Sequence, residues 1–368
     1  MIQERKMQND DCAFRVLDAG DPLDAKQWLV LWESWPEREV FAHPEYARLF
    51  CNENSKPLCA TMRSDGRQIL YPFILRDLKA EPFCCLETER ASDIVSPYGY
   101  GGPSSWGEGD KKEVSSAFWK CFSNWAAERN LVSEFVRFNL FPESLTDYPG
   151  EQEEMLLNVV RDLVPDEDEI WKDFEHNVRT NVRKAERSGV SVEADPTGER
   201  LDDFLRVYYS TMNRREADES YYFPHDFFEH VRAELAGHHA FFHAFWNGRV
   251  VSTELVLLSA DTAYAFLGGT DSEAFHVRPN DLLRYHIILW TRQAGKKRYV
   301  LGGGYQPDDG IFRQKRRFAP GSYAPFFVGR RVLNTHLYEQ LVEGRRLFEA
   351  SRDVEWLPRP GYFPAYRG

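Results

Sequence analysis

The chain has 368 residues, of which 42% are hydrophobic and 14% aromatic, and its formal net charge is -12. This length and composition predict two folded domains and exclude a largely disordered chain. The acidic balance argues against a general duplex-DNA binder, which needs a broad basic face to neutralise phosphates.

The N-terminal stretch and the cysteines indicate a cellular compartment. Residues 1–11 are charged and lack the apolar core of a signal peptide, and no run approaches the roughly 18 apolar residues of a membrane span. Six cysteines lie in the first third without a CxxC pair: Cys12, Cys51, Cys59, Cys84, Cys85 and Cys121. We therefore expect a cytosolic protein with reduced cysteines, no integral membrane segment and no metal site.

The first half predicts a meander of strands followed by a helix and a further strand. Its expected elements are strands at residues 57–63, 67–78 and 93–103, a turn at 64–66, a helix at 114–129 and a strand at 135–141. The acidic, proline-containing stretch 161–168 is the expected join to the second half.

An amphipathic helix is predicted at residues 169–188. Its apolar face consists of Ile170, Phe174, Val178, Val182 and Ala185. Arg179, Arg183 and Arg187 form a basic stripe beside that face. This stripe is either the solvated flank of the helix or a ridge that binds phosphate.

A cluster of arginines and tyrosines follows at residues 212–225. It contains Arg214, Arg215, Tyr221 and Tyr222. Because arginine and tyrosine together hold polar or phosphorylated ligands, the cluster predicts a lid or a substrate cradle. The alternative is that the tyrosines begin the packing of the next helix.

The second half repeats the order of elements of the first half. Its expected elements are strands at residues 241–246, 249–259 and 262–270, turns at 247–248 and 260–261, a helix at 281–294 and a strand at 298–301. Strand, turn, strand, strand, loop, helix and strand therefore occur twice, which predicts two similar α/β domains in tandem.

The segment from Gly302 to Pro320 combines a glycine run, two aspartates and a basic cluster. Three consecutive glycines predict backbone that closely approaches another group or has a positive φ. Four cations within five residues of an acidic chain, Arg313, Lys315, Arg316 and Arg317, predict an anion-binding patch. Asp308 and Asp309 either orient or deprotonate an amine, or form a turn.

For the acyl transfer implied by the family resemblance described in the next paragraph, these residues permit direct attack by an amine. Neither a Ser-His-Asp arrangement nor a Gly-x-Ser-x-Gly elbow is present, so nothing favours a covalent acyl-enzyme. A cation beside backbone N–H groups can stabilise the oxyanion that forms. His276 and His286 are further candidate bases.

Four segments resemble the Fem family of aminoacyl-tRNA-dependent transferases and the wider FemAB-like acyltransferases of GNAT fold. They are SPYGYGGP, NVRTNVRKAERSGV, FLGGTDSEAFHVRPNDLLRYHIILW and GGGYQPDDGIFRQKRRFAP. The resemblance extends from about Ala13 to Tyr338. It implies an α/β (α+β) fold of tandem GNAT-like domains, each a mixed, mainly antiparallel sheet flanked by helices. The implied domains are residues 13–162 and 163–319, with 320–368 packing back on the first.

The resemblance also implies roles for particular residues. A lysine in a Phe-Lys-x-x-Phe pattern stabilises the transition state in the Fem enzymes. The matching segment here runs from Phe312 to Phe318 with two extra residues between Phe and Lys, so Lys315 takes this role and Arg316 competes for it. Acceptor contacts in the family lie in a region comparable to that of Arg214, Arg215, Tyr221 and Tyr222. We assign Arg179, Arg183, Arg313 and Arg316 to substrate binding as well.

The donor predicted by the resemblance is aminoacyl-tRNA, and no bound cofactor is expected. The acceptor would be an amine of a cell-envelope precursor, an amino sugar or a small metabolite, with peptidoglycan assembly as the family's role. Residues 276–281 bear on this choice, because Pro279 lacks an N–H donor and Asp281 repels phosphate, although Asn280 suits a helix N-cap. This loop is a poor match to the pyrophosphate-binding loop of acyl-CoA-dependent enzymes.

Two alternatives remain open. One is an acyl-CoA-dependent N-acyltransferase of the GNAT superfamily. The other is a non-catalytic module that binds a nucleotide or an RNA end, such as the acceptor end of a charged tRNA, through Arg179, Arg183 and the cluster around Lys315.

Overall fold

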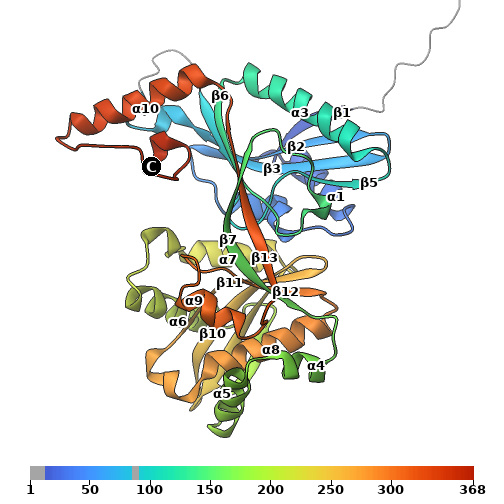
Figure 1. Cartoon of the computed structure of the whole chain (residues 1–368), viewed down its shortest axis with the longest axis vertical. Coiled ribbons are helices and arrows are strands. Elements are labelled where there is room, and N and C mark those ends of the chain that lie inside the picture. The colour runs from blue at the N-terminus through green and yellow to red at the C-terminus, as the bar shows by residue number, and fades with distance from the viewer. Residues whose placement is uncertain (1–12, 85–90) are drawn as a thin grey trace, which may run out of the picture. The chain divides into compact units, whose positions relative to one another are not determined.

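A computed structural model describes residues 13–84 and 91–368, which form two compact units (Figure 1). Unit 1 contains Phe41–Met155 and Phe326–Gly368 together with the described residues before position 37. Unit 2 contains Glu37–Val40 and Leu156–Pro325. The chain therefore passes from unit 1 to unit 2 near residue 155 and returns near residue 325.

Unit 1 is built on a mixed sheet in the order β1-β2-β3-β4-β6-β13, with β5 paired to β3. All neighbouring strands are antiparallel except β4 and β6, which are parallel. The strands are β1 (Ala13–Asp18), β2 (Ser55–Ser64), β3 (Arg67–Asp77), β4 (Ser92–Val95), β5 (Ser104–Gly107), β6 (Leu131–Arg137) and β13 (Tyr323–Val332). The helices are α1 (Pro22–Glu33), α2 (Pro44–Arg48), α3 (Lys111–Glu128) and α10 (Thr335–Ala350).

Alternate side chains of the central strands fill two cores on opposite faces of this sheet. Tyr71 and Phe73 of β3 pack with Phe118 and Phe122 of α3. Leu70, which directly precedes Tyr71, belongs instead to a cluster with the tryptophans of α1. This period of two is what a strand buried on both faces requires.

The strands of unit 2 follow the order β7-β12-β11-β10-β9-β8. Here β11 and β12 are parallel and the other neighbours are antiparallel. The strands are β7 (Glu151–Asp162), β8 (Ser191–Asp195), β9 (His239–Trp246), β10 (Arg249–Leu258), β11 (Thr262–Thr270) and β12 (Arg298–Gly302). The helices are α4 (Glu167–Asp173), α5 (His176–Arg187), α6 (Leu201–Arg214), α7 (His225–Glu234), α8 (Pro279–Gln293) and α9 (Gly310–Arg316).

Helices cover both faces of the unit 2 sheet (Figure 1). Phe242 of β9 contacts Trp290 of α8, with ring centroids 5.3 Å apart. Its neighbour Phe241 points the other way and contacts Phe204 of α6 at 5.0 Å. The apolar face of α5 lies in the same core as α8, since Val178, Val182 and Ala185 are all buried there.

The two units share the plan that the sequence predicts. In each unit a hairpin leads to a third strand, and a helix then connects that strand to a further strand parallel to it. In unit 1, α3 follows β4 and β5 and leads to β6, which is parallel to β4. In unit 2, α8 follows β11 and leads to β12, which is parallel to β11. The predicted turn residues Asp65-Gly66 and Asn247-Gly248 have positive φ at both positions, as tight hairpins of this kind require. The predicted fold class, mixed and mainly antiparallel sheets flanked by helices, is confirmed.

Two predicted strands of the first half are wrong in extent. The strand expected at residues 93–103 ends at Val95, because Pro97 cannot donate to a ladder and Gly99 and Gly102 have φ of 102° and 93°. The strand expected at 135–141 is β6, which begins four residues earlier and ends at Arg137.

The single helix predicted at residues 169–188 is also wrong, because the chain breaks there into α4 and α5. Phe174 and Glu175 have extended backbones, with ψ of 143° and 149°. Arg179 donates to the carbonyls of Lys172 and Phe174 at the end of α4, so the break leaves these groups satisfied. All five residues of the predicted apolar face are nevertheless buried.

The helix predicted at residues 281–294 begins two residues earlier than expected. Asn280 is not its N-cap, because Pro279 occupies the first helical position and Arg278 precedes it with a left-handed φ of 59°. Proline suits this first position, where its missing N–H has no helical partner.

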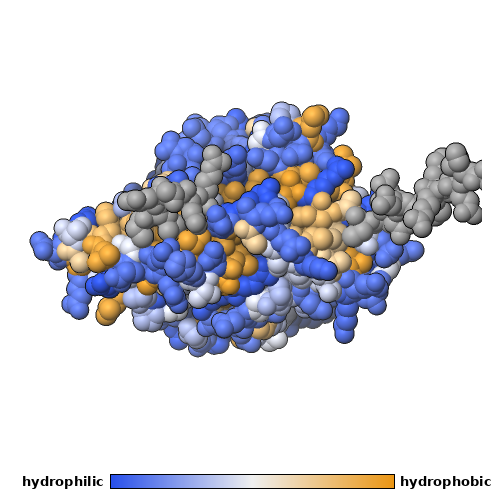
Figure 2. Space-filling view, turned by 90° about the horizontal axis from the view of Figure 1, so that it is seen from above, coloured by the Kyte–Doolittle hydropathy of each residue, from blue (hydrophilic) through white to orange (hydrophobic). Residues whose placement is uncertain are grey.

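The described cysteines, Cys51, Cys59, Cys84 and Cys121, are free thiols, and the other two lie outside the described residues. Within the part of the chain that the structure describes, no helix is long and apolar enough to span a membrane. Figure 2 shows a face on which hydrophilic side chains predominate and hydrophobic ones form patches between them.

The C-terminal residues are held in unit 1 by a buried polar network. Asp93 of β4 is fully buried and accepts from Nε of Arg76 and Nε of Arg367, both at 2.6 Å. Tyr366, also fully buried, donates to the same carboxylate at 3.0 Å. Leu337 and Leu341 of α10 share an apolar cluster with Tyr366.

Replacing Arg367 with alanine should destabilise unit 1 by about 2–3 kcal/mol, because it removes one of two cations from a buried carboxylate. Chemical denaturation followed by tryptophan fluorescence measures this change, since most tryptophans lie in unit 1. The matched control is Arg352→Ala, which removes an arginine that is 61% exposed and should cost less than about 1 kcal/mol. Equal effects of the two substitutions would contradict the role given to Asp93.

Candidate active site

A cavity of about 400 Å³, here called the unit 2 pocket, lies where two parallel strands separate. β11 and β12 pair only from Thr262 with Arg298 to Tyr264 with Val300. Beyond that point, residues 265–270 of β11 and Leu301 of β12 line the pocket. Beyond Tyr264, the edge of β11 on the β12 side therefore has no ladder with β12. A cavity of this size suits a small ligand or the reactive end of a large one.

Two charged side chains from the core of unit 2 line the pocket. Glu254 of β10 accepts from the hydroxyl of buried Tyr299 and lies 3.7 Å from Nε of Arg284 on α8. Nε and Nη1 of Arg284 are buried without a hydrogen-bond partner in the described structure. A buried donor with no acceptor is costly, so Arg284 is a strong candidate for holding a polar ligand group.

Lys315 is brought into the pocket by the short helix α9. Asp309 caps this helix by accepting from the backbone N–H of Phe312 at 2.8 Å, and Phe312 and Phe318 are buried on either side of the lysine. The Nζ of Lys315 donates to the carbonyl of Gly303 at 2.8 Å. Burial and, to a smaller extent, the nearby Arg284 lower the pKa of Lys315 to about 8, while Glu254 opposes the shift.

The glycine run makes this arrangement possible. Gly302 has a φ of 85°, and a Cβ on Gly304 would lie 2.2 Å from a carboxylate oxygen of Asp309. That carboxylate also accepts from the backbone N–H groups of Tyr305 and Gln306. The sequence predicted that the backbone of this glycine run closely approaches another group or has a positive φ. Gly304, which lies against Asp309, and Gly302, which has a positive φ, confirm this.

The other charged residues of the segment face different partners. Arg316 pairs with Asp308 at 2.9 Å, Arg317 lies 4.0 Å from Glu175, and Arg313 is exposed. Of the four cations, only Lys315 lines the pocket. Asp309 serves as a helix cap whose pKa is lowered by its backbone hydrogen bonds, and a role for either aspartate in catalysis stays a prediction.

The arginine and tyrosine cluster lies partly at the pocket. Arg214 and Arg215, at the end of α6, line it, and Arg214 donates to the carbonyl of Thr270 at 2.9 Å. Tyr221 contacts the pocket residue Tyr305, with ring centroids 5.9 Å apart. Tyr222 donates to the side-chain oxygen of Asn213 at 3.1 Å.

Arg179 and Arg183 do not line the unit 2 pocket. Arg179 caps the end of α4, and Arg183 lies over the ring of Trp171 at 5.3 Å. These contacts suit the flank of a packed helix. A phosphate-binding role for the two arginines stays a prediction.

Another wall of the pocket is formed by Arg278 and by the first turn of α8, through Pro279, Asn280 and Asp281. Asp281 accepts from Asn181 at 3.1 Å, and burial raises its pKa. Burial disfavours the charged form of this carboxyl group, while the hydrogen bond from Asn181 opposes the shift in its pKa.

Neither candidate histidine lines the pocket. His276 bonds to the carbonyl of Glu273 and packs on Trp246, and burial lowers the pKa of His286. Among residues 13–84 and 91–368, no group of three His, Cys, Asp or Glu side chains could hold a metal ion.

Sequence reasoning missed Glu254 and Arg284. The signal was present, because each is a charged residue at an inward position of an apolar element: Glu254 stands in the run VVSTELVLL and Arg284 in LLRYHIIL. A charge in such a position is rarely buried unless it is paired or functional.

Comparison with known proteins supports the fold and the broad class of activity. A family model described as an acetyltransferase (GNAT) domain matches residues 172–309, which include Arg214, Arg215, Glu254 and Arg284. The prediction of an acyltransferase is confirmed at this level. No curated protein sequence matches the chain.

Solved structures resemble the chain over most of its length. FemX is 13% identical, covers 86% of this chain and 97% of its own, and superposes with a TM-score of 0.64. The C-terminal domain of a putative lysylphosphatidylglycerol synthetase from Agrobacterium fabrum is 12% identical to this chain and superposes with a TM-score of 0.50. The match covers 89% of this chain and 96% of that domain. A conserved protein of unknown function from Bacteroides thetaiotaomicron is 8% identical and superposes with a TM-score of 0.54. The match covers 86% of this chain and 98% of that protein. At these identities the likeness establishes the fold, and the resemblance to FemX seen in the sequence is confirmed at that level.

The geometry around Lys315 predicts two opposite pKa changes. Glu254→Gln should lower the pKa of Lys315 below about 8, because it removes the negative charge that favours the ammonium form. Arg284→Gln should raise that pKa, because it removes a repelling cation. Titration of the Cε chemical shift in lysine-labelled protein measures both, with Lys315→Arg identifying the resonance. An ordinary value near 10.4 for Lys315 in the unsubstituted protein would contradict the burial of its amine.

Proposed function

We propose that the protein transfers an acyl group from an activated carrier to an amine in the unit 2 pocket. The observation that carries this proposal is the position of Lys315, whose partly buried ammonium group lies at the separation of β11 and β12 with a pKa of about 8. At neutral pH such a lysine is still mostly protonated, so it can stabilise negative charge in a site of low dielectric constant.

The proposed reaction is one nucleophilic displacement. The uncharged acceptor amine attacks the carbonyl carbon, which forms a C–N bond and an oxyanion. The bond from that carbon to the oxygen or sulfur of the carrier then breaks, and an amide remains. The proton lost by the attacking nitrogen goes to the leaving oxygen or sulfur. Lys315 would face the oxyanion, while Arg284 and Arg214 would hold polar groups of the substrates.

Aminoacyl-tRNA is the donor that we propose first, as in the Fem family that the chain resembles. The carrier's ester bond at the tRNA end would enter the pocket, and the acceptor would be an amine of a cell-envelope precursor, an amino sugar or a small metabolite. The similarity of fold to FemX supports this choice, and peptidoglycan assembly is the setting it suggests.

Acyl-CoA is a second candidate donor, favoured by two observations. The matching family model is that of acetyltransferases, and the first turn of α8 faces the pocket with Arg278 beside it. Helix N-termini with a nearby cation suit phosphate groups. A non-catalytic module that binds a nucleotide or an RNA end is the remaining alternative.

One experiment separates these donors. Purified protein is incubated with candidate amine acceptors and either charged tRNA or acyl-CoA, with RNase in a parallel arm, and the product is followed by mass. Product that forms only with charged tRNA and disappears with RNase supports the first proposal. Product formed from acyl-CoA in the presence of RNase would replace it with the second.

Lys315→Ala should lower kcat by about 10²–10³-fold, the usual loss when one oxyanion-stabilising group is removed. KM should change far less, because the proposed contact strengthens as the oxyanion forms. Steady-state kinetics with the donor identified above measures both constants. The matched control is Lys184→Ala on the exposed side of α5, which should leave both unchanged.

Two results would count against this role of Lys315. An unchanged kcat in Lys315→Ala would remove it from the reaction. Loss of ligand binding in the same variant, with no turnover by the unsubstituted protein in any arm, would favour the non-catalytic module.

A further inference from the structure

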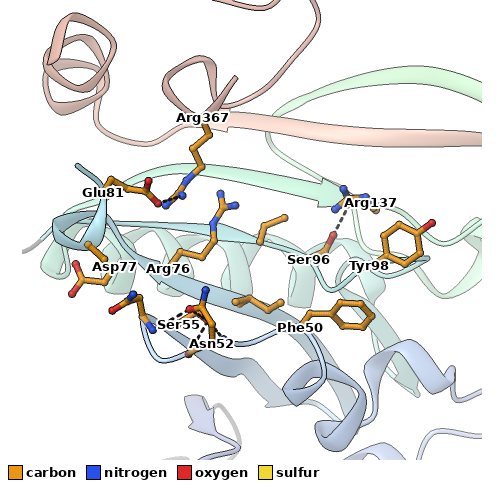
Figure 3. Close-up of a pocket in the computed structure, with 14 residues that line it drawn as sticks. Phe50, Asn52, Ser55, Arg76, Asp77, Glu81, Ser96, Tyr98, Arg137 and Arg367 are labelled. Atoms are coloured by element: carbon orange, nitrogen blue, oxygen red, sulfur yellow. Dashed lines mark hydrogen bonds and ion pairs between the residues drawn. The ribbon is translucent and has the colours of Figure 1, made fainter. Parts of the chain in front are cut away.

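A second cavity, here called the unit 1 pocket, lies within unit 1 and has a volume of about 290 Å³ (Figure 3). Like the unit 2 pocket, it lies at the end of a ladder between two parallel strands. The parallel ladder of β4 and β6 ends with Val95 and Phe135, and just beyond it the backbone N–H of Ser96 donates to the carbonyl of Phe135 at 3.0 Å. Val95, Ser96 and Arg137 then line the cavity from the two strands.

Arg137 is the most informative residue of the unit 1 pocket. It is the last residue of β6, and its backbone N–H donates to the hydroxyl of Ser96 at 2.8 Å. Its guanidinium lies 5.1 Å from the ring centroid of Phe135 and 6.0 Å from that of Tyr98. Burial lowers the pKa of Arg137, and the nearby Arg76 lowers it further.

No described residue accepts a hydrogen bond from the Arg137 guanidinium. Its two ring contacts stabilise the charge, but they leave its five N–H donors without an acceptor among the described residues. Water can serve some of these donors. A carboxylate or phosphate would serve them better, because it matches the planar fork and also balances the charge.

The other two arginines of the pocket already have acidic partners. Arg76 and Arg367 share Asp93, and Arg367 also pairs with Glu81. These pairs hold the two side chains in place, and Figure 3 shows Arg76 and Arg137 on different strands along one side of the cavity. Arg137 is therefore the one arginine lining the pocket that has no acidic partner among the described residues, and Asp77, which also lines it, accepts from the backbone N–H of Lys79.

The walls near Arg137 add a second preference. The rings of Phe50 and Tyr98 lie 6.1 Å apart and both line the cavity (Figure 3). Asn52 and Ser55 supply polar groups beside them. An aromatic wall next to an unbalanced arginine suits a ligand that carries both a flat apolar part and an anionic group.

We propose that the unit 1 pocket is a binding site for a small organic anion, whose phosphate or carboxylate group bonds to Arg137 and whose flat part packs on Phe50 and Tyr98. The site is separate from the Lys315 site and does not depend on the function proposed for it. Ligand binding here is non-covalent.

Calorimetric titration of the full chain with three probes tests this site. Phenyl phosphate and phenylacetate carry the two kinds of anion on the same ring, and benzyl alcohol is their neutral counterpart. We expect at least one anion to bind and benzyl alcohol to bind at least tenfold more weakly. The anion that binds more tightly identifies the chemistry of the natural ligand.

Arg137→Gln should weaken binding of that anion by tenfold or more, because charge-assisted hydrogen bonds contribute about 1.5–3 kcal/mol. Arg129→Gln is the matched control, since Arg129 also lies over an aromatic ring, Trp125, but is 49% exposed on another part of unit 1. It should leave binding unchanged. Lys315→Ala should also leave it unchanged, which separates this proposal from the one above.

Arg137→Lys provides a second variant in case the glutamine variant does not fold, as judged by thermal unfolding. It keeps the charge but loses the fork, so the anion should bind more weakly than to the unsubstituted protein. Equal binding of benzyl alcohol and the anions, no binding of either anion, or unchanged binding in both Arg137 variants would overturn the proposal.

Discussion

The limited pairing of one parallel strand pair in each unit is the constraint from which the rest of this structure follows. In unit 2 the ladder between β11 and β12 ends at Tyr264 and Val300, where the pairing of β11 with β10 also shifts register between Ala265 and Leu267. In unit 1 the ladder between β4 and β6 ends at Val95, one residue before the Ser96-Pro97 step. Where each ladder ends, side chains from the ends of its two strands line a common cavity. The crossover helix of each unit closes the core beneath that space, and a pocket remains at the carboxyl ends of the strands.

Burial gives the charges in these pockets their chemical character. In water, Lys315 would be an ordinary ammonium group, but in the unit 2 pocket it has lost solvent and lies near Arg284, so its pKa falls to about 8. Glu254 keeps it from falling further. Arg284 itself has two buried N–H groups without partners, which indicates that the pocket is arranged to receive an acceptor atom. Polar groups held in this way need little reorganisation when a substrate enters, which is the condition for electrostatic stabilisation of a transition state.

The loop from Gly302 to Pro320 shows how local chemistry selects one cation from four. The carboxylate of Asp309 accepts from three backbone N–H groups and fixes the start of α9, and Gly304 leaves room for it because it has no Cβ. With the helix fixed and Phe312 and Phe318 buried, only Lys315 can reach the pocket. Arg316 and Arg317 instead meet carboxylates outside it. Asp309 thus holds the start of α9 and Asp308 pairs with Arg316, which the paired motif alone does not reveal.

The sequence by itself determined the duplicated order of strands and helices, the hairpin turns at Asp65-Gly66 and Asn247-Gly248, and the apolar face of residues 170–185, because each depends on neighbours in the chain. It also singled out Lys315 through a family resemblance. Only the tertiary structure decided that residues 169–188 form two helices, that Arg179 and Arg183 lie outside the unit 2 pocket, and that Glu254, Arg284 and Lys315 meet. These outcomes depend on contacts between residues tens of positions apart, such as Arg284 with Glu254 or Phe174 with Phe318. Hydrophobic periodicity records which face of an element is buried, but it does not record what that face meets.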